Sequence, residues 1–256
     1  MKEALRRAIA IRDGLNKKTG YNDTNITDGV NHLSTDNKNV FIPQTQFVYN
    51  QDNADVIFDP FPFEFVEYIQ SSGTQYINTG YTPTNNTKFV IDFECVSTTS
   101  NYPYYFGAEN SDVSSRFGLW QNNTSFSPRY TPIGDTLQTS NYPINNRYVI
   151  EFSEGKVYVN GQVILQDTPN LTLSNIPIYL FAMNKNNAAN IADGEPSAMK
   201  LYSCQIYESL VLQKDLRPYK NKYTGYAGLM NILNNDIFIN IGSGSFTPGP
   251  VISGGE

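Results

Sequence analysis

The chain has 256 residues, a formal net charge of −6 and only 16% charged residues, while tyrosine and phenylalanine number 18 and 15. An acidic chain without a basic stripe lacks the usual footprint of a nucleic-acid-binding protein, so we expect no nucleic-acid partner. No apolar run approaches the roughly 20 residues that span a bilayer, so we expect no membrane association. The charged start MKEALRRAIAIRDGL is not a secretory signal, which predicts a protein made in a cytoplasm.

Residues 1–62 are predicted to form an N-terminal anchor. Residues 1–15 place apolar side chains at helical spacing, which predicts a short amphipathic helix. Residues 20–39 are polar, and residues 40–66 hold two apolar bursts that we interpret as an extended arm. A helix this short needs a packing partner, which is either its own domain or another chain. The scarcity of core residues in residues 20–39 favours another chain.

From residue 63 onward short strands alternate with turns. Residues 87–96 place Phe89, Ile91 and Phe93 on one side and charged residues on the other, the pattern of a half-buried strand. The Asn160-Gly161 pair between apolar alternations is a strong hairpin signal. Further strands are predicted at residues 102–108, 115–121, 147–152, 156–160, 162–166, 178–183, 199–207, 210–216, 226–232 and 236–240. This pattern predicts an all-β, two-sheet antiparallel sandwich as one domain over residues 63–256.

Two phrases bracket this domain. EYIQSSGTQYINTGY stands at residues 67–81 and SAMKLYSCQIYES at residues 197–209, and Arg217-Pro218 and the GSFTPGP run of residues 244–250 follow. Together they resemble the concanavalin A-like (laminin-G-like) jelly-roll modules of phage and prophage virion proteins and of gut-bacterial surface proteins. The resemblance implies a jelly-roll fold, whereas function does not follow from the fold because this fold carries unrelated activities.

This resemblance implies a non-enzymatic phage virion protein, either a head or tail fibre or a capsid decoration protein, with a lectin-like domain that binds host-surface glycans. It places the protein in the virion and attaches it to other capsid or tail proteins through residues 1–62. We also expect a homotrimer, because closed symmetric assembly would supply the partner chains that the anchor needs. Two alternatives remain open: a glycoside hydrolase-like jelly-roll enzyme and a bacterial cell-surface carbohydrate-binding protein.

The enzyme alternative depends on paired carboxylates. Glucanases of this fold class resemble an E-x-D-x-x-E pattern, and a retaining glycosidase needs its two carboxyls about 5 Å apart. The nearest imitation is Asp92-Phe93-Glu94, where Val90 occupies the position of the first glutamate. The sequence therefore predicts that the nucleophile and acid pair is missing and that the protein is not an enzyme.

A glycan-binding platform is predicted around Trp120, the single tryptophan. If Phe117 and Leu119 point inward, Trp120 lies on the opposite face beside polar side chains, as a sugar-stacking ring requires. The alternative is a tryptophan packed between the two sheets. The candidate platform residues are Arg116, Trp120, Asn122, Arg129 and Tyr130.

Metal and thiol chemistry have few candidates. Residues 184–197 (NKNNAANIADGEPS) supply Asp193, Glu195 and amide oxygens, which are ligands that calcium accepts, so calcium is the one cofactor considered. Two cysteines and one histidine are too few for a zinc site of the usual ligand set. Cys95 and Cys204 stand in strand-like runs, which predicts buried thiols, with a disulfide open if their strands are neighbours.

Overall fold

The computed structural model describes residues 46–50, 55–59, 62–97, 103–110, 115–122, 124–130, 141–166, 173–189 and 198–252. Within these ranges the chain is all-β, and no helix there is long and apolar enough to cross a membrane. The predicted helix of residues 1–15 lies outside the described residues. Contacts divide the chain into two units, residues 1–63 with 221–224 and residues 64–220 with 225–256.

The first unit contains a hairpin. Strands β1 (Gln46–Asn50) and β2 (Asp55–Asp59) are antiparallel, with Gln46 opposite Asp59 and Asn50 opposite Asp55. The sequence predicted an extended arm over this stretch, whereas its two apolar bursts pair with each other. Pairing satisfies backbone groups that a lone extended arm would leave to water or to a partner. The role of residues 1–62 as an anchor stays a prediction.

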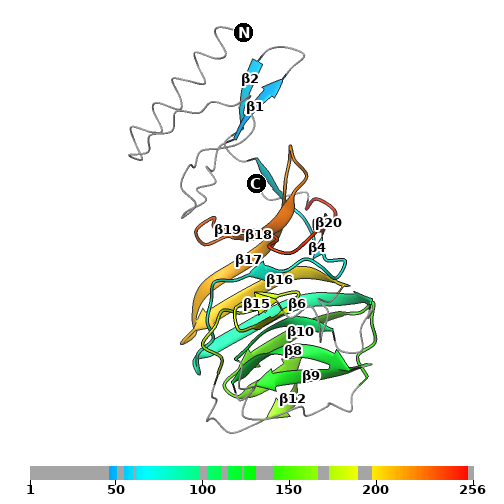
Figure 1. The fold of residues 1–256 in the computed structure, drawn as a ribbon, viewed down its shortest axis with the longest axis vertical. Coiled ribbons are helices and arrows are strands. Elements are labelled where there is room, and N and C mark those ends of the chain that lie inside the picture. Colours follow the sequence, from blue (N-terminus) through cyan, green and yellow to red (C-terminus); the bar gives the residue numbers. More distant parts are fainter. Residues whose placement is uncertain are drawn as a thin grey trace. The chain divides into compact units, whose positions relative to one another are not determined.

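The larger sheet belongs to the second unit and joins strands that are far apart in the sequence. Its order is β12-β11-β10-β6-β16-β17-β18-β19, with β3 beside β17 and β4 beside both β16 and β20 (Figure 1). The long strands β6 and β16 lie side by side at its centre, and both keep one wet face. The strands are β3 (Phe63–Phe65), β4 (Ile69–Gln70), β6 (Thr87–Ser97), β10 (Arg147–Ser153), β11 (Lys156–Val159), β12 (Gln162–Gln166), β16 (Ala198–Glu208), β17 (Val211–Asn221), β18 (Ala227–Asn231), β19 (Ile237–Phe238) and β20 (Thr247–Pro248).

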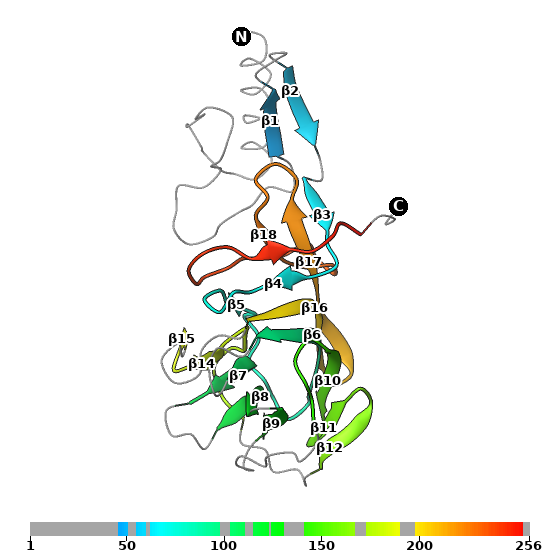
Figure 2. The same ribbon diagram turned by 90° about the vertical axis from the view of Figure 1, so that its right-hand side faces the viewer.

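The smaller sheet faces the larger one. Its order is β15-β14-β7-β13-β5, and β8 joins β9 to β7. The pairing of β14 with β7 is parallel, which departs from the antiparallel pattern expected from the sequence. Figure 2 shows β7, β8 and β9 opposite β6, β10 and β11, so the predicted all-β two-sheet sandwich is confirmed. The strands are β5 (Ile77–Asn78), β7 (Tyr104–Glu109), β8 (Arg116–Asn122), β9 (Ser125–Tyr130), β13 (Tyr179–Leu180), β14 (Met183–Lys185) and β15 (Ala188–Ala189).

Aromatic rings from both sheets fill the space between them. Phe89 of β6 lies 4.4 Å from Phe106 of β7, measured between ring centroids. Phe152 of β10 lies 5.1 Å from Phe117 of β8 and 5.3 Å from Tyr130 of β9. All five side chains are buried, and each large apolar side chain removed from water contributes about 1.5–3 kcal/mol. The alternation that defines each strand therefore also builds the core.

Two tight hairpin turns use left-handed backbone. Asn160 and Gly161, with φ of 49° and 80°, connect β11 to β12, as the sequence predicted. Ser209 and Leu210, with φ of 49° and 68°, connect β16 to β17 without a glycine. The side chain of Leu210 is 77% exposed, so no burial compensates the strained backbone of this turn.

The first and last strands of the second unit are neighbours. Val66 forms a bridge with Val251, and Ile69 of β4 lies opposite Pro248 of β20. The amide of Gly249 donates to the carbonyl of Tyr68 at 2.8 Å. The sheet is thus completed only when residues nearly 180 positions apart pair, since Gln70 lies opposite Thr247.

Candidate functional site

Trp120 lies on the face of β8 that points away from the core, and neighbouring side chains cover its ring. Phe117 and Leu119 point into the core with no exposed surface, so Trp120 lies on the opposite face of β8, as the sequence suggested. Its ring is only 6% exposed, with the Arg129 guanidinium 5.2 Å and the Tyr104 ring 6.4 Å from its centroid. A sugar could stack on this ring only if the groups that cover it moved.

The other predicted platform residues do not form one surface. Arg116 forms an ion pair with Glu109 at 3.3 Å on the same sheet. Tyr130 belongs to the core, where its ring packs edge-on against Phe117 at 5.6 Å. The side chain of Asn122 lies outside the described residues. The structure therefore brings Trp120 and Arg129 together and points Tyr130 toward the core, and sugar binding at this platform stays a prediction.

A polar cluster lies on the outer face of the larger sheet. Strand β6 points Phe89, Ile91 and Phe93 into the core and leaves Asp92 and Glu94 on the outer face, as the alternation predicted. The strand register places Glu94 between Arg147 of β10 and Lys200 of β16. Three neighbouring strands thereby bring two carboxylates within reach of two cations.

A β-bulge adds Tyr202 to this face. The register of β16 against β6 shifts between Leu201 and Ser203, so Tyr202 has no direct partner on β6. Tyr202 can then lie outward while Cys204, two positions on, returns to the core with no exposed surface. Without the bulge, strict alternation would put Tyr202 and Cys204 on the same side.

Short contacts fix the cluster. Arg147 donates from Nε and Nη2 to the two oxygens of Asp92, both at 2.7 Å, a bidentate pair. Its guanidinium also lies 3.7 Å from the centroid of the Tyr202 ring. Glu94 accepts from Lys200 Nζ and from the Tyr202 hydroxyl, each at 2.9 Å. Each polar group of the cluster is therefore held in place by at least one partner.

Tyr68 of the 66–70 segment borders the cluster. Its ring meets that of Tyr202 edge-on at 5.5 Å, and Lys200 Nζ lies 5.1 Å from its centroid. The ring packs on Gly249, where an added Cβ would stand 2.9 Å from ring atoms, so a side chain there would displace the ring. We call Tyr68, Asp92, Glu94, Arg147, Lys200 and Tyr202 the Tyr202 cluster.

The charge states of the cluster follow from these contacts. Burial alone would raise the pKa of Glu94, but hydrogen bonds from Lys200 and Tyr202 outweigh it and lower that pKa. Burial and the Glu94 hydrogen bond raise the pKa of Tyr202, and the Asp92 hydrogen bonds raise that of Arg147. At neutral pH Glu94 is thus a fixed acceptor, Tyr202 a neutral donor and Arg147 a cation.

The thiols and the candidate calcium loop lie elsewhere. Cys95 and Cys204 are buried and free, which confirms the prediction of buried thiols. Their strands are neighbours, but Cys95 lies opposite Met199 and Cys204 opposite Ile91, so the two thiols do not pair. Asp193 and Glu195 lie outside the described residues. Across the described ranges, no group of three or more His, Cys, Asp or Glu side chains could hold a metal ion.

Most of the cluster was missed by sequence reasoning. The predicted strands placed Asp92 and Glu94 on a wet face but gave no information on which strands adjoin β6. One signal was available for Tyr202. Met199 and Leu201 are followed by Cys204 and Ile206, so the apolar alternation shifts by one position, as a bulge requires.

Comparison with known proteins assigns no family to the chain. No protein-family model matches the chain, and no curated protein matches it. Among solved structures it is similar to Trypanosoma rangeli sialidase. The complex with the inhibitor DANA shows 16% identity and a TM-score of 0.36 over 47% of this chain and 20% of that chain. The complex with 2,3-difluorosialic acid shows 14% identity and a TM-score of 0.37 over 57% of this chain and 27% of that chain. The complex with sialic acid shows 13% identity and a TM-score of 0.37 over 63% of this chain and 30% of that chain.

One prediction requires correction beside these matches, which are to structures of an enzyme. The prediction that the protein is not an enzyme is wrong as it stands, because a missing pattern of carboxylates does not exclude an enzyme. The prediction rested on one missing pattern of carboxylates, whereas some glycosidases use a tyrosine nucleophile and need no such pair. The chain spans less than a third of the sialidase, and TM-scores of 0.36 to 0.37 assign no activity to it.

Proposed function

We propose that the second unit is a carbohydrate-binding β-sandwich and that the Tyr202 cluster is its ligand site. The observation that supports this is the arrangement of Arg147, Asp92, Glu94 and Lys200, which are held by contacts of 2.7 to 2.9 Å on an outer sheet face beside two tyrosine rings. Sugar hydroxyls both donate and accept hydrogen bonds, and their rings have apolar faces. A site for them combines fixed donors, fixed acceptors and aromatic surface.

Rigidity also favours this reading. Arginine and lysine lose about 2 kcal/mol of rotamer entropy when they are immobilised. Here Arg147 is already immobilised by Asp92 and by the Tyr202 ring, and Lys200 is held by Glu94. Ligand binding therefore costs less side-chain entropy, because both side chains are already ordered in the free protein. A shallow site of this kind should still bind weakly, with a dissociation constant of about 10 μM to 1 mM.

The proposal is tested on a glycan array with the full chain. Tyr202→Ala removes the ring under Arg147 and the donor to Glu94, and binding should fall at least about tenfold. Tyr158→Ala is the matched control, because Tyr158 lies opposite Glu151 on the outer side of the same sheet, beyond the cluster. Trp120→Ala tests the platform predicted from the sequence. Loss of binding with Trp120→Ala alone would move the site there, and no binding to any glycan would refute the proposed function.

Hydrolysis is measured in the same samples by released oligosaccharide. This covers the alternative of a glycoside hydrolase-like enzyme. Release that disappears with Glu94→Gln or Asp92→Asn would make the cluster a catalytic site as well as a binding site. Circular dichroism of each variant must match that of the parent chain.

A narrower proposal rests on the sequence resemblance alone. In it, the domain is carried on a phage particle as a fibre or a capsid decoration protein, and residues 1–62 anchor a homotrimer to other virion proteins. A bacterial cell-surface glycan-binding protein is the alternative. Deletion of residues 1–60 should abolish both trimers in light scattering and attachment to particles. A truncated protein that keeps both would place the anchor elsewhere.

Calcium at residues 184–197 is likewise a proposal. Bound calcium would stabilise the folded chain by mass action. Melting with calcium and with a chelator should then differ, and Asp193→Asn should remove the difference. Equal melting temperatures for the parent chain would exclude calcium binding to the folded state.

A further inference from the structure

Two arginine–aspartate ion pairs on the outer face of the larger sheet expose the arginine and cover the aspartate. The side chain of Arg147 is 50% exposed and that of Asp92 18%. On β17 the side chain of Arg217 is 40% exposed and that of Asp215 only 7%. In both pairs a covered carboxylate lies beneath an exposed guanidinium. The face therefore presents two arginine ends to any ligand.

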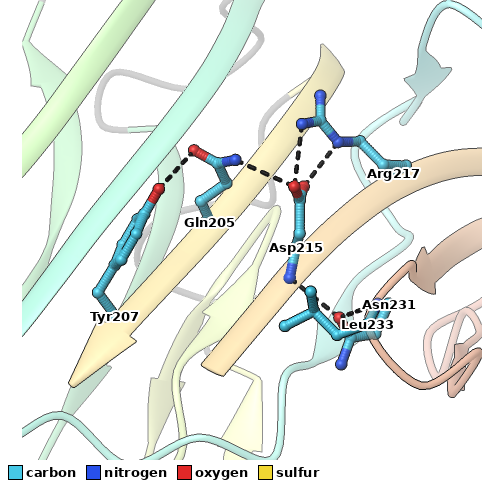
Figure 3. Close-up of polar contacts among 6 residues, drawn as sticks. All are labelled: Gln205, Tyr207, Asp215, Arg217, Asn231 and Leu233. Carbon is cyan, nitrogen blue, oxygen red and sulfur yellow. Dashed lines mark hydrogen bonds and ion pairs between the residues drawn. The ribbon is translucent and has the colours of Figure 1, made fainter. Parts of the chain in front are cut away.

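Asp215 is also held by several contacts. It accepts from Arg217 Nη2 and from Gln205 Nε2, both at 3.1 Å, and its carboxylate also lies 2.6 Å from Arg217 Nε. The hydroxyl of Tyr207 donates to Gln205 at 3.2 Å, and the Asp215 amide donates to Asn231 Oδ1 at 3.0 Å (Figure 3). This network ties three strands together and orients Arg217.

Each guanidinium keeps donors for a ligand. Arginine has five N–H groups; Arg147 donates from Nε and Nη2 to Asp92, and Arg217 donates from Nη2 to Asp215 with its Nε beside the same carboxylate. The remaining Nη donors form an edge that matches the geometry of a carboxylate, which accepts two parallel hydrogen bonds. An aspartate on one edge and a ligand carboxylate on the other would balance the guanidinium from both sides.

The two arginines are too far apart for one small acid. β10 and β17 are separated by β6 and β16, so three strand spacings of about 4.8 Å put their backbones roughly 14 Å apart. One carboxylate cannot reach both. A chain of sugars that carries acidic groups at intervals can.

We propose that the ligand of this face is a carboxylated polysaccharide, a chain of uronic-acid-type sugars that spans Arg147 and Arg217. This inference rests on the proposed glycan-binding function and adds the substrate class and a second contact point outside the Tyr202 cluster. Nucleic acid is the competing polyanion. Its closely spaced phosphates require a basic stripe, whereas on this face each of the two arginines is paired with an aspartate.

Calorimetry with the full chain tests the class of ligand. The probes are polygalacturonate, alginate and hyaluronate, each beside its methyl-esterified form, which keeps the sugar chain and removes the charge. The acid forms should bind at least about tenfold more tightly than the esters, since a charge-assisted contact is lost at each arginine. Binding of polygalacturonate should tighten with chain length until both arginines are spanned.

Paired substitutions test the two arginines without leaving a carboxylate buried and unpaired. Arg147→Gln with Asp92→Asn, and Arg217→Gln with Asp215→Asn, each keep polar side chains at both positions and the net charge of −6. Each should weaken binding of the acid form about tenfold. The matched control is Lys88→Gln with Glu151→Gln, a pair 2.9 Å apart whose two side chains are equally exposed at 30%. It should change affinity less than about twofold, as do most exposed pairs.

Each outcome decides one idea. If neutral glycans bind the array but no carboxylated polymer binds better than its ester, the acidic-ligand inference fails and the proposed function stands. If nothing binds, both fail. If single-stranded DNA binds as tightly as the acidic sugars, the face is a nonselective polyanion surface and the inference is refuted. If the Arg217 pair has no more effect than the control, the ligand does not extend to β17.

Discussion

A pair of glycines in the smaller sheet sets a sharp test of packing. Gly107 of β7 lies opposite Gly118 of β8. A Cβ added at Gly118 would stand 2.6 Å from the carbonyl oxygen of Phe106 and 2.8 Å from the Cα of Gly107, which are both backbone atoms. Backbone in the middle of a sheet cannot move without disturbing its ladder. Gly118→Ala should therefore destabilise the fold by about 2–3 kcal/mol, as overpacked cores do.

Gly107→Ala provides the matched comparison. Its Cβ would stand 2.6 Å from Met183 Cε and Sδ, the end of a flexible side chain, although the Phe117 carbonyl oxygen is also near at 2.9 Å. Shortening Met183 to alanine should thus offset part of the cost at Gly107, with a coupling of about 1 kcal/mol, and less of the cost at Gly118.

Thermal and urea denaturation followed by circular dichroism measure both effects. For a domain of this size 1 kcal/mol corresponds to about 2–4 °C in melting temperature, so Gly118→Ala should lower it by about 4–12 °C. A Gly118→Ala variant within about 0.5 kcal/mol of the parent chain would refute the reasoning, because ordinary surface substitutions fall in that range.

Three further predictions follow from single contacts. The pKa of Glu94 in the folded chain is lowered from 4.5, so its ionisation contributes stability that is complete above that value and is lost as the pH falls through the lower folded value. Glu94→Gln should therefore reduce the loss of stability in acid. Denaturation curves of the variant and the parent chain with equal pH dependence would contradict this. Leu210→Gly should stabilise the chain by about 0.5–1 kcal/mol, since it relieves a left-handed leucine with little burial to lose, and a destabilised variant would show that the turn is not strained. Burial raises the pKa of both Cys95 and Cys204, so neither thiol should react with a disulfide reagent until the chain unfolds, and rapid labelling of the native chain would contradict their burial.

Local alternation predicted the sandwich well because it depends only on neighbouring residues. From Lys88 to Cys95 the alternation of apolar and polar residues alone separates inward from outward side chains. The Asn160-Gly161 turn follows from the left-handed backbone that these residues adopt easily. The turn at Ser209-Leu210 carries no such signal, since leucine rarely adopts this conformation.

The Tyr202 cluster could not be predicted in this way. Asp92, Arg147 and Tyr202 come from three strands whose order in the sheet is set by long-range pairing, which a single sequence does not reveal. Trp120 shows the opposite limit. Its face was inferred correctly from Phe117 and Leu119, but its exposure depends on what covers that face. For Tyr130 the alternation with buried Phe126 on β9 already indicated the core.

The hydrogen-bonded pairing of β4 with β20 brings the first and last segments of the sandwich together. Because Val66 and Val251 are bridge partners, the polypeptide enters and leaves this unit at neighbouring points of one sheet edge. A unit with adjacent entry and exit can be inserted into a surface loop of another protein without stretching that host. The same geometry permits the segments at Val66 and Val251 to be joined by a short linker, with new termini opened at the exposed Leu210 turn. One backbone bridge thus allows the outer face of the larger sheet to be displayed from many different carriers.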